Sequence, residues 1–199
     1  MTNQRLLIVV ALSALLSLAL PWWHITMHAP QYPDGLTVTV SPFSVSGNVA
    51  EIDELNHYIG FRPLETIATR ERSMAWLAIP AALLPLLAAF WLPLRRFAWL
   101  AALPFAIVPP SFVGDMIIWM WYAGHHLDPH AALSSSVSPW TPHFLGPGGV
   151  GQFKTFAMFD AGFALALIAT ACTVVLVVRA ALRREHQPGY DPAIAGHAS

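Results

Sequence analysis

Four long apolar stretches, none of which contains Lys or Arg, constrain this chain more than any other feature. A helix needs about 20 apolar residues to cross the hydrocarbon core of a bilayer. The four stretches cover residues 6–22, 74–92, 97–122 and 156–178. Charged residues make up only 11% of the chain, whereas a soluble domain has roughly 25%. We therefore predict an all-α membrane protein, in which residues 1–199 form a single domain with four transmembrane helices.

Composition and net charge exclude several other protein classes. A hydrophobic content of 56% is too high for an intrinsically disordered chain. The single Cys172 has no partner for a disulfide-stapled fold, and a net charge of -1 without a basic stripe argues against nucleic-acid binding.

Residues 6–22 could instead be a cleaved signal peptide, because Arg5 precedes them. The tandem Trp22 and Trp23 favour a retained span, since Trp anchors at headgroup depth.

The basic residues indicate how the chain is oriented in the membrane. The arginines that fall on one side of a four-span arrangement are Arg5, Arg95, Arg96, Arg179, Arg183 and Arg184. Because positive charge favours the cytoplasm, we expect a multi-pass protein of the bacterial inner membrane with both termini cytoplasmic. The loops 23–73 and 123–155 then face the periplasm. A tight cytoplasmic turn at 93–96 makes the second and third spans antiparallel neighbours, and the end of the cytoplasmic tail 179–199 is expected to be disordered.

The first periplasmic loop is expected to contain a short β element and an amphipathic helix. Residues 36–40 alternate with period two and predict a strand, with residues 44–48 as a weak partner. Residues 48–60 predict a helix with Asn48 as its N-cap and Gly60 after its last turn. The second loop has no helical period, and long irregular loops are often functional.

Histidine is concentrated in these two loops. The seven that precede the C-terminal tail are His24, His28, His57, His125, His126, His130 and His143. Imidazole suits copper, zinc and iron, and the Met thioether selects Cu(I). If the first span continues as a helix for one more turn, His24, Met27 and His28 project from one face. The predicted metal ligands are His24, Met27, His28, His57, His125, His126, Asp128 and His130. Copper, zinc and iron remain the alternatives for the metal at this point.

The same residues also fit a metal-free interpretation, because the amphipathic His ring is common at membrane interfaces and this spacing matches no fixed metal motif. Asp115 and Asp160 lie within the third and fourth expected spans, where a carboxylate marks a functional or pairing role. The alternative is that each carboxyl is hydrated near the outer surface or is protonated. No nucleophile elbow, Walker loop, dinucleotide fingerprint or zincin motif is present, so an enzyme is the less favoured class.

Three stretches carry a resemblance to a known family. They are residues 29–36 (Ala-Pro-Gln-Tyr-Pro-Asp-Gly-Leu), residues 55–60 (Leu-Asn-His-Tyr-Ile-Gly), and residues 125–129 (His-His-Leu-Asp-Pro) followed by Thr141-Pro142 and Gly151-Gln152-Phe153. Together they resemble a family of small polytopic membrane proteins found in bacterial gene clusters for nitrous oxide reductase and its copper-delivery machinery. The second stretch usually ends in Met in that family, whereas this chain has Phe61. If that Met is a copper ligand, this chain lacks it.

The resemblance implies an accessory role, either copper handling or maturation and electron supply for a periplasmic cuproenzyme such as nitrous oxide reductase. Two alternatives remain open at this point. One is a metal-free scaffold subunit that docks a larger complex through its loops, and the other is a subunit of a membrane redox enzyme. In each case the expected partners are the lipid bilayer and a periplasmic or membrane protein, and not nucleic acid.

Overall fold

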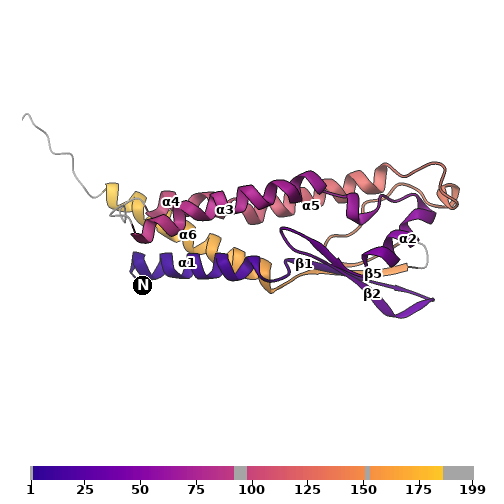
Figure 1. Cartoon of the computed structure of the whole chain (residues 1–199), viewed down its shortest axis with the longest axis horizontal. Helices are drawn as coiled ribbons and strands as arrows, with labels where there is room; N and C mark the ends of the chain where they lie inside the picture. The colour runs from indigo at the N-terminus through magenta and orange to yellow at the C-terminus, as the bar shows by residue number, and fades with distance from the viewer. Residues whose placement is uncertain (1, 92–97, 151–152, 186–199) are drawn as a thin grey trace, which may run out of the picture.

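A computed structural model describes residues 2–91, 98–150 and 153–185. The molecule is elongated, with a bundle of helices at one end and a β-sheet at the other (Figure 1). The first helix begins and the last helix ends at the bundle end, away from the sheet. The expected turn at 93–96 and most of the expected tail, from residue 186 onward, lie outside the described residues.

The bundle is built from apolar helices that meet through small side chains. Its helices are α1 (Asn3–Leu18), α3 (Thr69–Trp91), α4 (Ala98–Ala106), α5 (Val108–His125) and α6 (Ala161–Glu185). Helix α1 packs along α6, and Ala11, Ala14 and Ala169 are buried in the shared core. Small residues allow helix backbones to approach closely. Leu86 and Phe105 fill the same core and are fully buried.

The described strands form one five-stranded antiparallel sheet in the order β3-β2-β1-β5-β4. They are β1 (Trp23–Ala29), β2 (Tyr32–Val40), β3 (Val45–Gly47), β4 (Gly146–Val150) and β5 (Phe153–Phe159). The central strand β1 follows α1, and its neighbour β5 leads directly into α6. The two strands pair from Trp23 opposite Phe159 to His28 opposite Lys154. Two adjacent helices of the bundle are therefore continuous with two adjacent strands of the sheet.

The predicted all-α fold is wrong, because the chain is a mixed α/β protein. Helix α1 ends at Leu18, before Pro21, and residues 23–29 form a strand instead of another helical turn. The fourth expected span also began too early, because Phe156–Phe159 belongs to β5. That strand has apolar residues on both faces, so its sequence runs without a polar break toward the helix that follows. Such a run cannot be assigned to a strand or a helix by periodicity alone.

The β-hairpin and the amphipathic helix of the first loop are both present. Strands β2 and β3 pair in register from Val38 opposite Gly47 to Val40 opposite Val45. Helix α2 (Val49–Ile59) ends at Gly60, whose φ of 76° is left-handed. Asn48 does not cap α2 with its side chain; its Oδ1 accepts a hydrogen bond from the Thr37 backbone N–H at 3.1 Å instead. The residue thus ties the start of α2 to the sheet.

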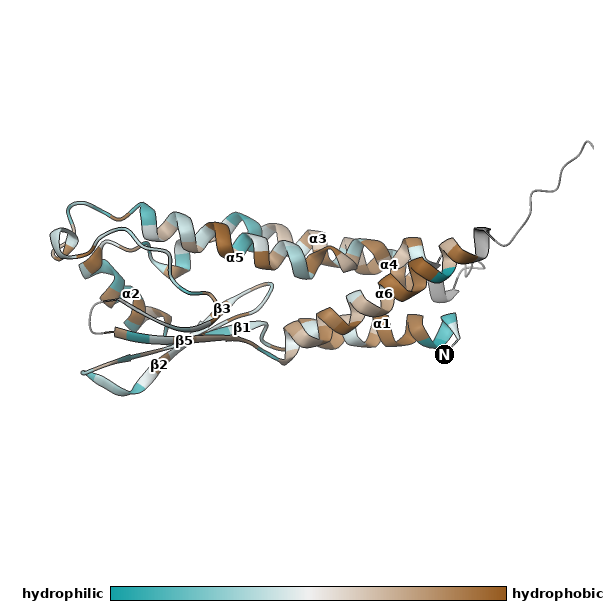
Figure 2. Cartoon of the chain, turned by 180° about the vertical axis from the view of Figure 1, so that it is seen from behind, coloured by the Kyte–Doolittle hydropathy of each residue, from teal (hydrophilic) through white to brown (hydrophobic). Residues whose placement is uncertain are grey.

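Two helices among the described residues are long and apolar enough to cross a membrane, namely Trp99–His125 and Ala161–Leu182. Helix α1 is apolar but has only 16 residues. The expectation of four such helices is therefore not supported. Figure 2 shows apolar residues concentrated on the bundle, while polar residues are more frequent toward the sheet end and its loops.

Candidate functional site

The main candidate site is a cavity between the sheet and two helices that run past the bundle. Helices α3 and α5 continue beyond the bundle and pass along the sheet (Figure 1). The space between them and the sheet has a volume of about 930 Å³. Ligand pockets typically measure roughly 300–1,000 Å³, so the cavity is large enough for a sizeable organic molecule. We call the face of the sheet that lines this cavity the inner face.

The inner face is apolar because the strands alternate with period two. Trp23, Ile25 and Met27 of β1 line the cavity, as do Val38 and Val40 of β2. The alternate residues of β1, which are His24, Thr26 and His28, are directed to the opposite, outer face. One set of β1 side chains therefore forms an apolar floor, and the other set carries the imidazoles.

Helices α3 and α5 supply the opposite wall of the cavity. Met74 and Ala78 line it from α3, and Phe112, Met116 and Trp119 line it from α5. The α5 residues are three to four positions apart, which places them on one face of that helix. Gly114 also lines the cavity, and a Cβ added there would meet no atom within 4 Å. The wall is therefore open to a larger side chain at this position.

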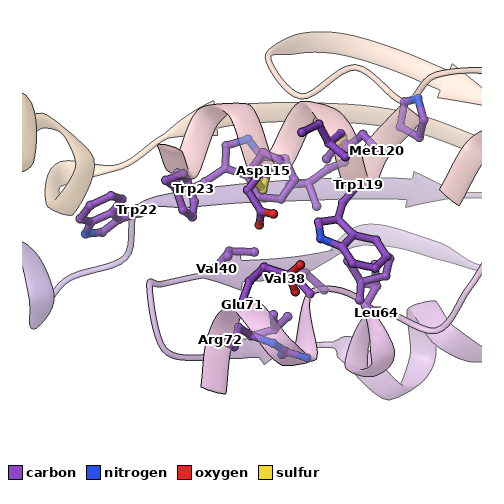
Figure 3. Close-up of a pocket in the computed structure, with 18 of the residues that line it drawn as sticks. Trp22, Trp23, Val38, Val40, Leu64, Glu71, Arg72, Asp115, Trp119 and Met120 are labelled. Carbon is purple, nitrogen blue, oxygen red and sulfur yellow. The ribbon is translucent and has the colours of Figure 1, made fainter. Parts of the chain in front are cut away.

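Two carboxylates and one guanidinium lie within this apolar surface. The side chains of Glu71 on α3 and Asp115 on α5 project into the same part of the cavity (Figure 3). Trp119, one turn along from Asp115, is a hydrogen-bonding partner of its carboxyl group. Arg72 also lines the cavity, but its Nη2 donates to the backbone carbonyl of Glu65. The acidic pair therefore shares its part of the cavity with an arginine that is anchored elsewhere.

Asp115 was expected within the third span, and it lies within the candidate membrane-crossing helix Trp99–His125. Phe112 packs with Trp22 and Phe163 at the beginning of α6. Asp115 lies almost one turn further along α5, at the level of the sheet and not among the helices of the bundle. Its carboxyl group faces the cavity.

Asp160 is not inside a helix, because it precedes the first residue of α6. Its carboxylate oxygens both lie 2.9 Å from Nδ1 of His24, forming a salt bridge if His24 is protonated. Its backbone N–H donates to the carbonyl of Trp22 at 3.0 Å. An acidic side chain at a helix N-terminus is favoured by the helix dipole. Asp160 thus joins α6 to the central strand.

The predicted metal ligands do not form one cluster. The expectation that His24, Met27 and His28 share a helix face is wrong, because they lie on a strand, with Met27 on the inner face and the imidazoles on the outer face. His125 and His126 lie at the end of α5, where each Nδ1 contacts a backbone carbonyl at 2.8 and 2.9 Å. Both rings also stack on aromatic neighbours.

The remaining predicted ligands lie near the end of α2. His57 belongs to α2, and the Tyr58 carbonyl accepts a hydrogen bond from the Leu133 N–H. Asp128 Oδ1 accepts from the His130 N–H at 2.9 Å. In residues 2–91, 98–150 and 153–185, no group of three or more His, Cys, Asp or Glu side chains is placed to hold a metal ion.

The sequence interpretation missed most of the cavity. Glu71, Arg72, Trp119, Trp140 and His143 line it and were not predicted as site residues. The alternation of Trp23, Ile25 and Met27 was a usable signal for the apolar floor. Nothing local in the sequence places α3 and α5 opposite that floor.

No protein-family model matches this chain, and no curated protein is similar to it in sequence.

Proposed function

We propose that this chain is an accessory protein of the bacterial inner membrane that supports a periplasmic or membrane protein partner. In this proposal the helical bundle lies in the bilayer, both termini are cytoplasmic, and the sheet stands on the periplasmic side. The working site is the cavity between the sheet and the helices α3 and α5.

The observation that carries the proposed membrane placement is the apolar outer surface of the bundle. Large apolar side chains are exposed on α1, α3, α4 and α6, for example Leu12, Leu16, Leu77, Leu84, Leu100, Leu167, Ile168 and Val174. Contiguous exposed apolar surface of this extent is unfavourable in water and marks contact with a membrane or a protein. A bilayer surrounds the bundle with hydrocarbon, so that the exposed apolar side chains of all four helices contact apolar surroundings.

The orientation rests on charge and on chain direction. Arg5 lies near the start of α1 and Arg179 near the end of α6, and these two ends lie at the same end of the bundle (Figure 1). Because cytoplasmic segments are enriched in Lys and Arg, this end is proposed to be cytoplasmic. The sheet, at the other end, is then periplasmic.

Copper handling is a second candidate function, favoured by the surroundings of His24. Ring N–H groups of metal-bound His usually donate to a carboxylate, which fixes the ring and leaves the other nitrogen for the metal. Asp160 holds Nδ1 of His24 in this manner at 2.9 Å. Met158 is the cross-strand partner of His24 and brings a thioether to the same face. The candidate copper site therefore has two donors, His24 and Met158, whereas the sequence predicted eight metal ligands.

Thiol labelling in intact cells tests the proposed membrane placement. Cys172 is the only cysteine, so Cys172→Ser provides a background without thiols. On that background, Ser46→Cys at the sheet edge and Gln4→Cys at the start of α1 provide matched exposed positions. A membrane-impermeant maleimide should label the Ser46 variant in intact cells and the Gln4 variant only after lysis. The reverse pattern, or recovery of the chain in the soluble fraction, contradicts the proposal.

The candidate copper-handling function is tested by measuring Cu(I) binding to the purified protein. His24→Ala and Met158→Leu should each reduce Cu(I) binding, while His28→Ala, on the same face but four residues away, should leave it unchanged. Equal binding by wild type and the His24 variant contradicts a copper site at His24.

A further inference from the structure

The cavity is lined in a way that separates an apolar region from a polar one. At the bundle end, Ala78, Ile79 and Val108 line it, and Ile79 belongs to the buried core of the bundle. Glu71, Arg72 and Asp115 supply charge further toward the sheet. A matching ligand has an apolar tail and a charged head.

The apolar end of the cavity lies beside the surface assigned to the bilayer. Leu77 on α3 and Ile107, just before α5, are 78% and 64% exposed. Each is next in sequence to a residue that lines the cavity, Ala78 and Val108 respectively. A molecule could therefore pass from the bilayer to the cavity along apolar surface, without crossing water.

The charged side chains of the cavity are complementary to a ligand head group that carries both a positive and a negative charge. Two carboxylates from different helices favour an ammonium group, and the Trp119 ring beside them is a good partner for a cation. Arg72 uses one of its five N–H donors in the bond to Glu65, and guanidinium groups bind phosphate well. A phosphate ester close to an amine thus finds opposite charges at both of its groups.

We propose that the cavity binds a zwitterionic, amine-bearing phospholipid taken from the outer leaflet of the membrane. An acyl chain occupies the apolar region between the sheet and helices α3 and α5. The ammonium group faces Glu71 and Asp115, and the phosphate faces Arg72. This inference rests on the proposed membrane placement of the bundle.

The test measures phospholipid retained by the full-length protein purified in detergent. Purified protein is incubated with mixed micelles that contain equal amounts of phosphatidylethanolamine and phosphatidylglycerol, repurified, and its lipid is quantified by mass spectrometry. Wild type should retain phosphatidylethanolamine in preference to phosphatidylglycerol. Gly114→Phe should fill the cavity from α5, because the space beside Gly114 is open, and should reduce retention about tenfold, equivalent to roughly 1.4 kcal/mol.

Ile117→Phe is the matched control, since it makes the same residue on the same helix at a position outside the cavity lining. It should retain lipid as wild type does. Asp115→Asn should retain total lipid but lose the preference for the amine-bearing head. Unchanged retention in the Gly114 variant overturns the proposal, as does preferential retention of phosphatidylglycerol or of neither lipid by wild type.

The outcome is separable from that of the labelling experiment. A chain that is labelled as expected but retains no phosphatidylethanolamine keeps its proposed membrane placement and loses the lipid site. A chain labelled in the reverse pattern loses the proposed orientation, whatever lipid it retains in detergent.

Discussion

Two glycines on α5 meet opposite surroundings. A Cβ added to Gly124 would overlap the backbone carbonyl of Trp140, whereas a Cβ added to Gly114 would meet nothing within 4 Å. The Gly124 carbonyl also accepts a hydrogen bond from the Trp140 N–H at 3.2 Å. Gly124 therefore allows the loop that carries Trp140 to lie directly on α5, where Trp140 closes part of the cavity.

Alanine at these two positions should shift stability in opposite directions. Gly124→Ala forces the loop away from α5 and should lower the free energy of unfolding by about 1–3 kcal/mol, as overpacking does. Gly114→Ala removes a flexible residue from a helix and should raise it by about 0.5–1 kcal/mol. Thermal unfolding of both variants in one detergent provides the comparison. A loss of stability in both variants would show that the space beside Gly114 is not open.

At the scale of elements, α2 is held to the sheet by a small apolar core. Ile52 is 6% exposed and packs with Val49 of the same helix and with Leu36 and Val38 of β2. Ile52 also lines the cavity, so the same contact positions α2 as one of its walls.

Ile52→Ala should lower the free energy of unfolding by about 2–5 kcal/mol, the usual cost of removing a buried Ile side chain. Hydrogen exchange should increase in α2 and in β2 more than in the bundle, because the lost contacts join these two elements. Tyr58→Ala is the control on the same helix, since Tyr58 is 55% exposed. Protection in α2 that is equal in both variants would contradict this role for Ile52.

The elements that the sequence predicted correctly are those whose signals are local. The β2–β3 hairpin follows from the alternation of residues 36–40, and α2 follows from its apolar face and the left-handed Gly60. Strands β1 and β5 were missed because each adjoins an apolar helix. An apolar run of this length has the same composition whether its last residues pair in a sheet or continue a helix.

The site could be predicted far less well than the elements. In sequence, Glu71 and Asp115 are separated by most of α3, all of α4 and the start of α5. They face the same part of the cavity only because α3 and α5 pass along the same sheet. The metal ligands were grouped by helical spacing, which put Met27 on the wrong face of β1 relative to His24. Tertiary arrangement, and not residue type, decides which of these side chains converge.

At the scale of the whole molecule, a short junction at Trp22 couples the sheet to the bundle. Trp22 is fully buried, its ring packs edge-on against Phe112 and Phe163, and its indole N–H donates to the Ser17 carbonyl at 2.8 Å. The Gly162 N–H donates to the carbonyl of Pro21 at 2.9 Å, close to the start of α6. The junction thus joins α1, α5 and α6 where β1 begins and β5 ends.

Trp22→Ala should therefore destabilise both halves together, by about 3–5 kcal/mol. Two measurements in detergent report on the bundle and on the sheet separately. The bundle is followed by the reactivity of the Cys172 thiol, which packs against the bundle core. The sheet is followed by hydrogen exchange of the β1 and β5 amides. In the Trp22 variant, Cys172 reactivity and strand amide exchange should both increase at a lower temperature or denaturant concentration than in wild type, and at the same one as each other. Trp121→Ala removes a half-exposed Trp from α5 and should leave both probes near wild type. If the Trp22 variant exposes the strand amides while Cys172 stays protected, the two halves fold independently and the junction does not couple them.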